Sequence, residues 1–352
     1  MNSRKVQTLQ NALAGLNFSG LDRLFQQYDN ALGMILAFPR VGISVDGKFS
    51  PNAAELVSPE FLSSVIDVLT RRDIEIISIA DLPQRIRKPL DNQRFAVLTF
   101  DNAYRDTAHH AVPVLEQKNV PFTLNVATGL IEGSADLWRL GLQKLLQQQR
   151  RLMIQTAQGP LELDCDSNGA KQKSFDFLKK YLSEDVPEIE MRERVREICW
   201  LYKIDLDALR EEAIMNWDEL IELSANPLCT LGTMTIDHHR LSRLTAEKAR
   251  YEVVQGATVL QGVTGEKPAH FCYPYGDRDA ASTREFEIVR KARFKTGLTR
   301  RTGLIYPEHK NHMMALPRVT VSGLFQRKRF FGPLTSGLPS ILANGFKRLD
   351  AG

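Results

Sequence analysis

The chain has 352 residues, of which 43% are hydrophobic and 25% are charged. This composition is ordinary for a globular protein, and it excludes a disordered or low-complexity chain. The formal net charge of +4 is small for this length, so it gives no reason to expect a nucleic-acid partner. The length allows one large domain or two ordinary ones.

The spacing of the cysteines and the polarity of the N-terminus indicate the cellular compartment. Cys165, Cys199, Cys229 and Cys272 are widely spaced without a CxxC pair, so they indicate neither a zinc knuckle nor a disulfide framework. The first residues are too polar for the apolar core of a signal peptide. The most apolar early run, residues 31–38, is under half of what spans a bilayer. We therefore expect a cytoplasmic protein.

The first hundred residues begin with helical spacing and then show short apolar runs. Apolar residues at helical spacing predict one amphipathic helix over residues 1–30, and residues 32–38 read as a buried strand. A helix is expected to begin after Ser58, because a capping serine is followed by proline and a carboxylate. The β-branched run at 74–79 predicts a second strand.

The most informative strand is the apolar run Phe95 to Phe100, which ends in Asp101 and Asn102. A helical pattern begins at Asp106 and continues to about Lys118, and another strand is expected at 121–127. Strand, helix and strand at this spacing predict βαβ units in a parallel sheet. Polar groups at the end of a buried strand are where α/β enzymes place their chemistry.

The segment 136–216 interrupts this rhythm because it is rich in Gln, Lys, Arg and Glu. We predict helices at about 137–150, 171–182 and 187–199, with a fourth before Asn216. Their acidic and basic residues are interleaved, which is typical of a solvated face. The segment is therefore interpreted as a helical insertion or lid.

The regular pattern returns after the insertion. Strands are expected at 229–233, 271–273 and 296–299, and helices at 245–260 and 284–291. The tail from Arg327 is basic and aromatic, and a further helix is expected at 341–346. Such a tail either touches anionic lipid peripherally or packs on its own domain. The expected organisation is an N-terminal helix (1–31), a main domain (32–326) and this tail (327–352).

The central strand resembles the polysaccharide deacetylase family, the NodB-homology carbohydrate de-N-acetylases. The family's pattern is Thr-Phe-Asp-Asp-Gly-Tyr, and the chain has Thr-Phe-Asp-Asn-Ala-Tyr at residues 99–104. The resemblance puts Asp101 in the place of the catalytic base and Asn102 in the place of a metal-binding aspartate. Tyr104 is a substrate-binding candidate. The family's first strand ends in a pattern that contains a histidine, and Pro39 stands at that position in this chain.

A second stretch, residues 231–244, resembles the family's His-x-x-x-His motif. His238 aligns with the second metal-binding histidine, whereas Met234 falls where the first should be. His239 stands where proline is usual. The resemblance thus leaves His238 as the one retained metal ligand, because an Asn carbonyl is a weak ligand and a thioether suits soft metals.

Two further motifs are kept intact. Tyr-Pro-Tyr-Gly at residues 273–276 matches a family motif in which the backbone amide at the Tyr275 position stabilises an oxyanion. The resemblance makes Tyr273, Pro274 and Gly276 substrate-binding candidates. Leu-Pro-Arg-Val at residues 316–319 matches a late family pattern, and Arg318 is expected to hold a carboxylate or to orient Asp101.

The resemblance implies an α/β fold, an irregular (β/α)7 barrel with a helical insertion, over residues 32–326. The family's reaction is hydrolysis of N-acetyl groups on amino sugars, so the expected partner is an amino-sugar polysaccharide or oligosaccharide. Because two ligand positions are changed, we expect weak or lost hydrolysis and no cofactor, with a divalent ion such as zinc as the alternative. Three hypotheses remain: a silent carbohydrate-binding protein, an active enzyme whose site is rebuilt around Asp101, His238 and either His239 or Asp237, and a scaffold that regulates an active relative.

Overall fold

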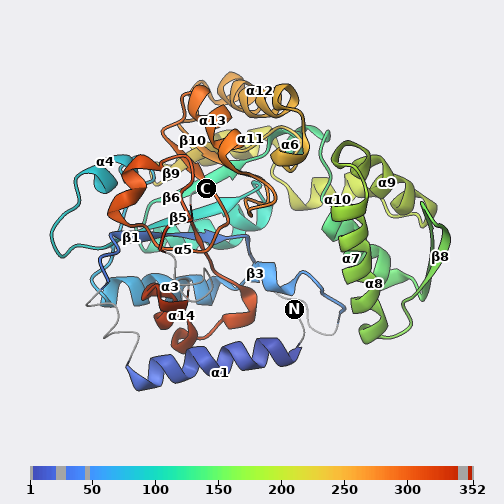
Figure 1. The fold of residues 1–352 in the computed structure, drawn as a ribbon, viewed down its shortest axis with the longest axis horizontal. Coiled ribbons are helices and arrows are strands. Elements are labelled where there is room, and N and C mark those ends of the chain that lie inside the picture. Colours follow the sequence, from blue (N-terminus) through green and yellow to red (C-terminus); the bar gives the residue numbers. More distant parts are fainter. Residues whose placement is uncertain (1–2, 21–28, 44–47, 340–347, 351–352) are drawn as a thin grey trace.

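A curled, parallel β-sheet organises the chain (Figure 1). The computed structural model describes residues 3–20, 29–43, 48–339 and 348–350. Within these residues the sheet has eight strands, of which seven follow the order β11-β10-β9-β6-β5-β1-β12 and β4 pairs with β5. The strands are β1 (Gly33–Phe38), β4 (Glu75–Ile76), β5 (Phe95–Asp101), β6 (Phe122–Val126), β9 (Cys229–Thr233), β10 (His270–Cys272), β11 (Thr296–Leu298) and β12 (Val319–Thr320).

The sheet is curled, so that its two ends approach each other. β12 pairs with β1, and Leu316, just before β12, forms a parallel bridge with Leu298 of β11. The apolar runs of β1 and β5 are buried along their length, as strands covered on both faces require. The predicted α/β class with a barrel-like parallel sheet is confirmed. Since the strands are parallel, their carboxyl ends meet at one edge.

Helices cover the sheet, and their starts follow local capping chemistry. Ser58 accepts a hydrogen bond from the Phe61 N–H, and Thr245 from the Lys248 N–H, each with its side-chain oxygen. The covering helices are α3 (Pro59–Arg71), α4 (Leu82–Arg87), α5 (Val112–Gln117), α6 (Thr128–Glu132), α11 (Trp217–Ser224), α12 (Ala246–Thr264) and α13 (Thr283–Lys291). A π-helical turn, Thr107–Ala111, precedes α5, where Pro113 has no N–H to donate.

Some predicted strands are shorter than expected, and small elements complete the fold. The strand expected at 74–79 is reduced to Glu75–Ile76, and the strand β12 was not predicted. Both consist of two residues, too few for a periodic signal. The remaining small elements are β2 (Arg40–Val41), β3 (Leu56–Val57) and short 3-10 helices at Ala53–Glu55, Leu241–Arg243, Pro307–Asn311 and Gly323–Phe325.

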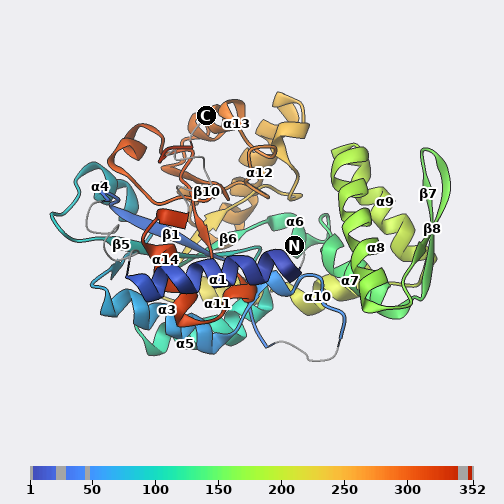
Figure 2. The same ribbon diagram turned by 60° about the horizontal axis from the view of Figure 1, so that its bottom comes forward.

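The helix α1 packs against α14 on one side of the barrel, and α14 in turn packs against α3 (Figure 2). The helix α1 spans Ser3–Ser19 and is followed by Gly20 at φ +70°, so the single helix predicted over 1–30 is wrong in length. Residues 21–28 and the helix expected at 341–346 lie outside the described residues. In the tail, α14 (Lys328–Thr335) buries Phe330 and Phe331.

The insertion forms a separate body beside the barrel (Figure 1). It contains α7 (Trp138–Gln148), β7 (Arg151–Thr156), β8 (Gly159–Asp164), α8 (Asn168–Lys180), a π turn (Tyr181–Asp185), α9 (Glu188–Leu201) and α10 (Leu206–Ala213). The four predicted helices are present. The antiparallel β7–β8 hairpin was missed, and it buries Leu152 and Ile154 in a hydrophobic cluster whose buried members belong to the insertion, with Phe49 packed against it from outside.

In the described ranges, no helix has the length and apolar character needed to cross a membrane.

Candidate active site

A pocket of about 100 Å³ lies where the carboxyl ends of the sheet strands meet the insertion. Strand ends supply Ala37, Asp101, Met234 and Tyr273, and the insertion supplies Trp138 and its neighbours. The pocket is lined by Ala37, Pro39, Arg40, Asn52, Glu55, Asp101, Asn102, Tyr104, Leu130, Asp136, Leu137, Trp138, Arg139, Leu140, Met234, His238, Tyr273, Tyr275, Arg300 and Arg318. Most residues that the sequence motifs single out therefore meet in one place.

Asp101 ends β5 and is held by three nitrogen donors, with the Cys272 thiol as a fourth donor at 3.7 Å. Arg318 donates from its two terminal nitrogens to the two carboxylate oxygens at 2.9 and 3.0 Å, and Asn125 Nδ2 donates to Oδ1 at 2.8 Å. Burial alone would raise the pKa of Asp101, but the charge and hydrogen bonds of Arg318 lower it overall. The expected contact between Arg318 and Asp101 is present, and the carboxylate is charged at neutral pH.

Space for Asn125 is made on the neighbouring strand. A Cβ atom at Gly232 of β9 would lie 2.3 Å from Asn125 Oδ1, so only glycine leaves this amide in position beside Asp101. Asn125 is fully buried in β6. The sequence motifs did not single out Asn125 or Gly232, because their proximity to Asp101 follows from strand register.

Asn102 and Ala103 form a tight left-handed turn after β5, with φ values of +71° and +52°. Asn tolerates this region, whereas Ala pays roughly 1 kcal/mol for it. The Asn102 N–H donates to Asn125 O at 2.8 Å. Its side-chain Oδ1 is buried, and no hydrogen-bond partner lies within the described part of the chain. The turn thus presents an unsatisfied amide oxygen to the pocket.

Met234 and His238 lie on the loop after β9. Met234 is 2% exposed, and its N–H donates to Val126 O. His238 has φ +57°, donates its N–H to Thr235 Oγ1 and packs its ring against Tyr275, with 5.1 Å between centroids. Burial, and then the charge of Arg139, lowers the pKa of His238 to about 4, so its imidazole is neutral at pH 7.

The residues at the family's metal position do not fit a hard divalent ion. The unsatisfied amide oxygen of Asn102 and the neutral imidazole of His238 are two usable donors, but neither carries charge. The third position offers the thioether of Met234, which suits soft metals. A catalytic zinc site holds three strong protein ligands and leaves a position open. This donor set lacks two of them.

The Tyr-Pro-Tyr-Gly turn projects Tyr275 into the pocket with φ +61°. Among the described residues, no acceptor bonds the Tyr275 N–H. A backbone N–H without a protein partner is able to donate to a ligand oxygen. The Tyr275 hydroxyl accepts a hydrogen bond from Trp138 Nε1 at 3.1 Å. Pro274 and Gly276 are buried and do not line the pocket. Gly276 has φ +62°, and a Cβ there would meet the Arg300 nitrogen at 2.6 Å.

The two remaining tyrosines have different surroundings. Tyr104 is 8% exposed and lies under the guanidinium of Arg40, 4.8 Å from its ring centroid. Tyr273 is 1% exposed, and its hydroxyl donates to Met314 O at 2.9 Å. The hydroxyl of Tyr273 is therefore already hydrogen-bonded within the protein. A substrate-binding role for Tyr104 or Tyr273 stays a prediction.

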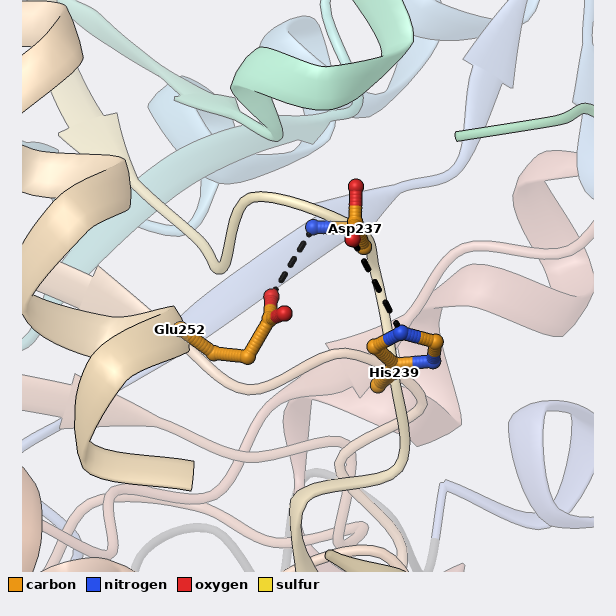
Figure 3. Close-up of side chains that lie close together, drawn as sticks. All are labelled: Asp237, His239 and Glu252. Atoms are coloured by element: carbon orange, nitrogen blue, oxygen red, sulfur yellow. Dashed lines mark hydrogen bonds and ion pairs between the residues drawn. The ribbon is translucent and has the colours of Figure 1, made fainter. Parts of the chain in front are cut away.

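A second group of ligand-type side chains lies beside the pocket, formed by Asp237, His239 and Glu252 (Figure 3). One donor atom from each lies within 4.8 Å of the others. Glu252 Oε2 accepts from the Asp237 N–H at 2.9 Å, and His239 Nε2 lies 3.9 Å from Asp237 Oδ2. Asp237 and His239 flank His238 but do not line the pocket that contains Asp101.

Each member of this group already has polar partners. These partners are Ser134 and Arg192 at Asp237, Glu188 at His239, and Lys248 at Glu252. A cation would compete here with two basic side chains. The arrangement is sufficiently explained as an ion-pair network that joins the insertion to the barrel, since Arg192 and Glu188 both belong to α9.

Several pocket residues were not foreseen from the sequence. Trp138 and Arg139 come from the insertion, which was interpreted as a solvated face, and Arg300 follows β11 outside any motif. Arg139 pairs with Glu55 at 2.8 Å. A tryptophan at the start of a polar helix was the one available signal, because such a residue needs a partner to bury against.

The fold and this strand-end pocket define a class, the (β/α)-barrel proteins with a polar cleft at the carboxyl ends of their strands. A family profile described as polysaccharide deacetylase matches residues 206–296, which include Met234, His238 and Tyr275. The predicted resemblance to the polysaccharide deacetylase family is therefore confirmed over this segment. Among proteins of curated function, none matches the sequence.

Solved deacetylase structures share the fold. Streptococcus pyogenes deacetylase PplD has 14% identity and a TM-score of 0.54, covering 82% of this chain and 92% of that chain. IcaB from Ammonifex degensii has 16% identity and a TM-score of 0.54, with 86% and 97% covered. BC0361, a polysaccharide deacetylase from Bacillus cereus, has 11% identity and a TM-score of 0.53, with 86% and 68% covered. At these identities the likeness is one of fold.

Proposed function

We propose that this chain binds an amino-sugar saccharide in the strand-end pocket and that its N-acetyl hydrolysis is weak or lost. The observation that carries the proposal is the donor set at the family's metal position. Asn102 and Met234 line the pocket with His238 and supply neither a carboxylate nor a second imidazole. The fold and the family support an amino-sugar ligand.

The remaining groups suit binding better than hydrolysis. A divalent ion, when bound, would polarise the acetyl carbonyl and acidify water, and this donor set fits one poorly. Asp101 keeps the place of the base, but Arg318 lowers its pKa and occupies both of its oxygens. A general base works best with a pKa near the operating pH. The Tyr275 N–H remains a donor for an acetyl oxygen, which favours binding of the acetamide.

The alternative is an active deacetylase with a rebuilt site. It would use Asp101 and His238 with His239 or Asp237 as the substitute ligand. The carboxylate of Asp237 engages Ser134 and Arg192, and the imidazole of His239 engages Glu188. Neither residue lines the pocket that holds Asp101. This placement favours the binding function over the rebuilt enzyme. A scaffold that pairs with an active relative remains the third hypothesis.

The test is metal content, measured by mass spectrometry on the purified protein and on the double variant Asn102→Asp with Met234→His. We expect no stoichiometric zinc in the wild type and about one ion per chain in the double variant. The two single variants are matched controls, because each restores only one of the two lost ligands. If the double variant binds no more metal than the wild type, these side chains do not form one ligand set.

Metal in the wild type would contradict the proposal, and two further variants would locate it. Loss of the ion in His238→Gln would place it in the pocket and support the rebuilt enzyme. Loss in Glu252→Gln alone would place it in the group of Asp237, His239 and Glu252.

A further inference from the structure

The charges around the pocket are unevenly paired. Four arginines line it, and three of them have carboxylate partners among the described residues. These pairs are Arg318 with Asp101, Arg139 with Glu55, and Arg40 with Asp106. The other carboxylate of the lining, Asp136, is held by Arg192 at 3.8 Å and Arg196 at 2.9 Å, both outside the lining. Arg300 is the remaining lining arginine.

The Arg300 side chain makes no hydrogen bond or ion pair within the described ranges of the chain. Its backbone N–H donates to Gly276 O at 2.8 Å, which fixes its Cα beside the turn that carries Tyr275. Burial raises the pKa of Asp101, and the guanidinium of Arg300 is near enough to oppose that rise, after Arg318 and Asn125. Arg300 therefore brings an uncompensated positive charge to the pocket.

A second cation without a partner in the described residues approaches from the insertion. Lys179 lies near the end of α8, is exposed and does not line the pocket. Burial, Arg139 and Arg300 lower the pKa of its ammonium, whereas Glu55 and Asp176 oppose that shift. Lys179 therefore stands within electrostatic range of the pocket, and Arg300 remains the lining cation whose charge a bound anion would neutralise.

The same region offers aromatic surface. The ring of Tyr275 lies 5.5 Å from the Arg139 guanidinium and 4.3 Å from that of Arg240, and its hydroxyl accepts from Trp138. Aromatic faces give a sugar ring apolar contact, while an arginine fork matches the oxygens of a carboxylate or phosphate. A neutral saccharide would leave the Arg300 charge without a partner.

We infer that the saccharide bound in this pocket is acidic, an amino sugar that carries a carboxylate or phosphate group held by Arg300. The inference rests on the proposed amino-sugar binding and adds the charge of the ligand. Carboxylate and phosphate share the recognition chemistry, and the experiment below separates them.

The test is calorimetric titration of the whole chain with three sugars: N-acetylglucosamine, N-acetylglucosamine 1-phosphate and N-acetylmuramic acid. Charge-assisted hydrogen bonds are worth about 1.5–3 kcal/mol, so at least one acidic sugar should bind roughly tenfold or more tightly than the neutral one. Raising the salt concentration should weaken only the acidic sugars. Tighter binding of the 1-phosphate would identify a phosphate as the anionic group, and tighter binding of N-acetylmuramic acid would identify a carboxylate.

Arg300→Gln is the decisive variant, since its side chain has no hydrogen bond or ion pair to lose in the described structure, and it should erase the preference for the acidic sugar. Arg250→Gln is the matched control, because Arg250 is an exposed arginine on α12 outside the pocket, and it should keep the preference. A thermal melt of each variant verifies folding.

Three results would count against the inference. Equal affinity for all three sugars overturns it and leaves the proposed amino-sugar binding intact. A preference that survives Arg300→Gln also overturns it, because the anion then lies elsewhere. Binding of none of the sugars overturns the inference together with the proposed function.

Discussion

The carboxylate of Asp101 and the guanidinium of Arg318 form the most constrained contact of the pocket. Arg318 is 1% exposed and also donates from Nε to Thr299 O at 2.8 Å. A buried ion pair adds little over a well-packed apolar pair, but removing one partner leaves a buried charge without compensation. The contact therefore fixes the geometry of the site and makes each partner dependent on the other.

Arg318→Met should lower the free energy of unfolding by about 3–5 kcal/mol, because Asp101 then remains as a buried charge without its main partner. Urea denaturation at pH 7 measures this loss. In an Asp101→Asn background the same substitution should be milder, and the difference is the coupling energy of the pair. A loss below about 1 kcal/mol in the wild-type background would show that the two charges are screened by solvent.

Residues carried by local motifs were the predictable part of the site. Asp101 ends β5, Tyr275 follows β10 and Arg318 directly precedes β12, each within a recognisable motif, and the structure brings them into one pocket. Arg300 and Lys179 could not be foreseen in the same way. Their positions depend on how segments distant in the sequence pack around the pocket, and neither residue stands in a pattern that distinguishes it from other basic side chains.

At the scale of elements, the insertion has its own hydrophobic cluster. α7 contributes Leu142, Leu145 and Leu146, and β7 contributes Leu152 and Ile154. The barrel strands belong to other clusters. Segments with separate cores open in separate cooperative units, so the insertion and the barrel should respond differently to core damage.

Leu145→Ala should therefore loosen the insertion selectively. Leu145 is fully buried, and truncating such a leucine costs about 2–5 kcal/mol. Hydrogen exchange should speed up across residues 138–201 and stay unchanged in β5 and β6. Leu124→Ala in β6 is the matched control, and it should raise exchange in the barrel strands. Equal acceleration of both bodies by Leu145→Ala would mean that they unfold as one unit.

Elements with strong local signals were well predicted, and those determined by packing were not. β5 has a long apolar run, and its bounds agree closely with expectation. α3 has a clear cap, and it begins where predicted, directly after Ser58. The β7–β8 hairpin has short alternating runs in a charged context, so its strand pattern was overlooked. In α1 the helical spacing was extended beyond Gly20, where the helix ends.

At the scale of the whole molecule, buried histidines link stability to pH. Burial lowers the pKa of His238, His270 and His309 to about 4 in each case. They come from the pocket loop, β10 and a 3-10 helix, so the effect is not confined to one site. In the unfolded chain their pKa returns to the ordinary value of 6.5, at which the imidazole begins to bind protons.

The sign of the linkage follows from these values. Below pH 6.5 the unfolded chain binds more protons than the folded one, so stability should fall from pH 6.5 towards pH 4 and level off above 6.5. At about 1.4 kcal/mol per pKa unit, each buried imidazole contributes at most about 3 kcal/mol. The pKa of Asp101 is lowered from its ordinary value of 3.8, so this carboxylate causes a further loss of stability only below pH 3.8.

Urea denaturation at pH 7.5 and pH 4.5 should show this fall, and His270→Gln should reduce it. His270 is 2% exposed and bonds Thr296 through Nδ1 at 2.8 Å, a contact that a glutamine amide is able to replace. The exposed His109→Gln is the matched control and should leave the pH dependence as in the wild type. Equal stability of the wild type at both pH values would mean that these imidazoles are protonated in the folded protein, with water reaching sites that the packing seals.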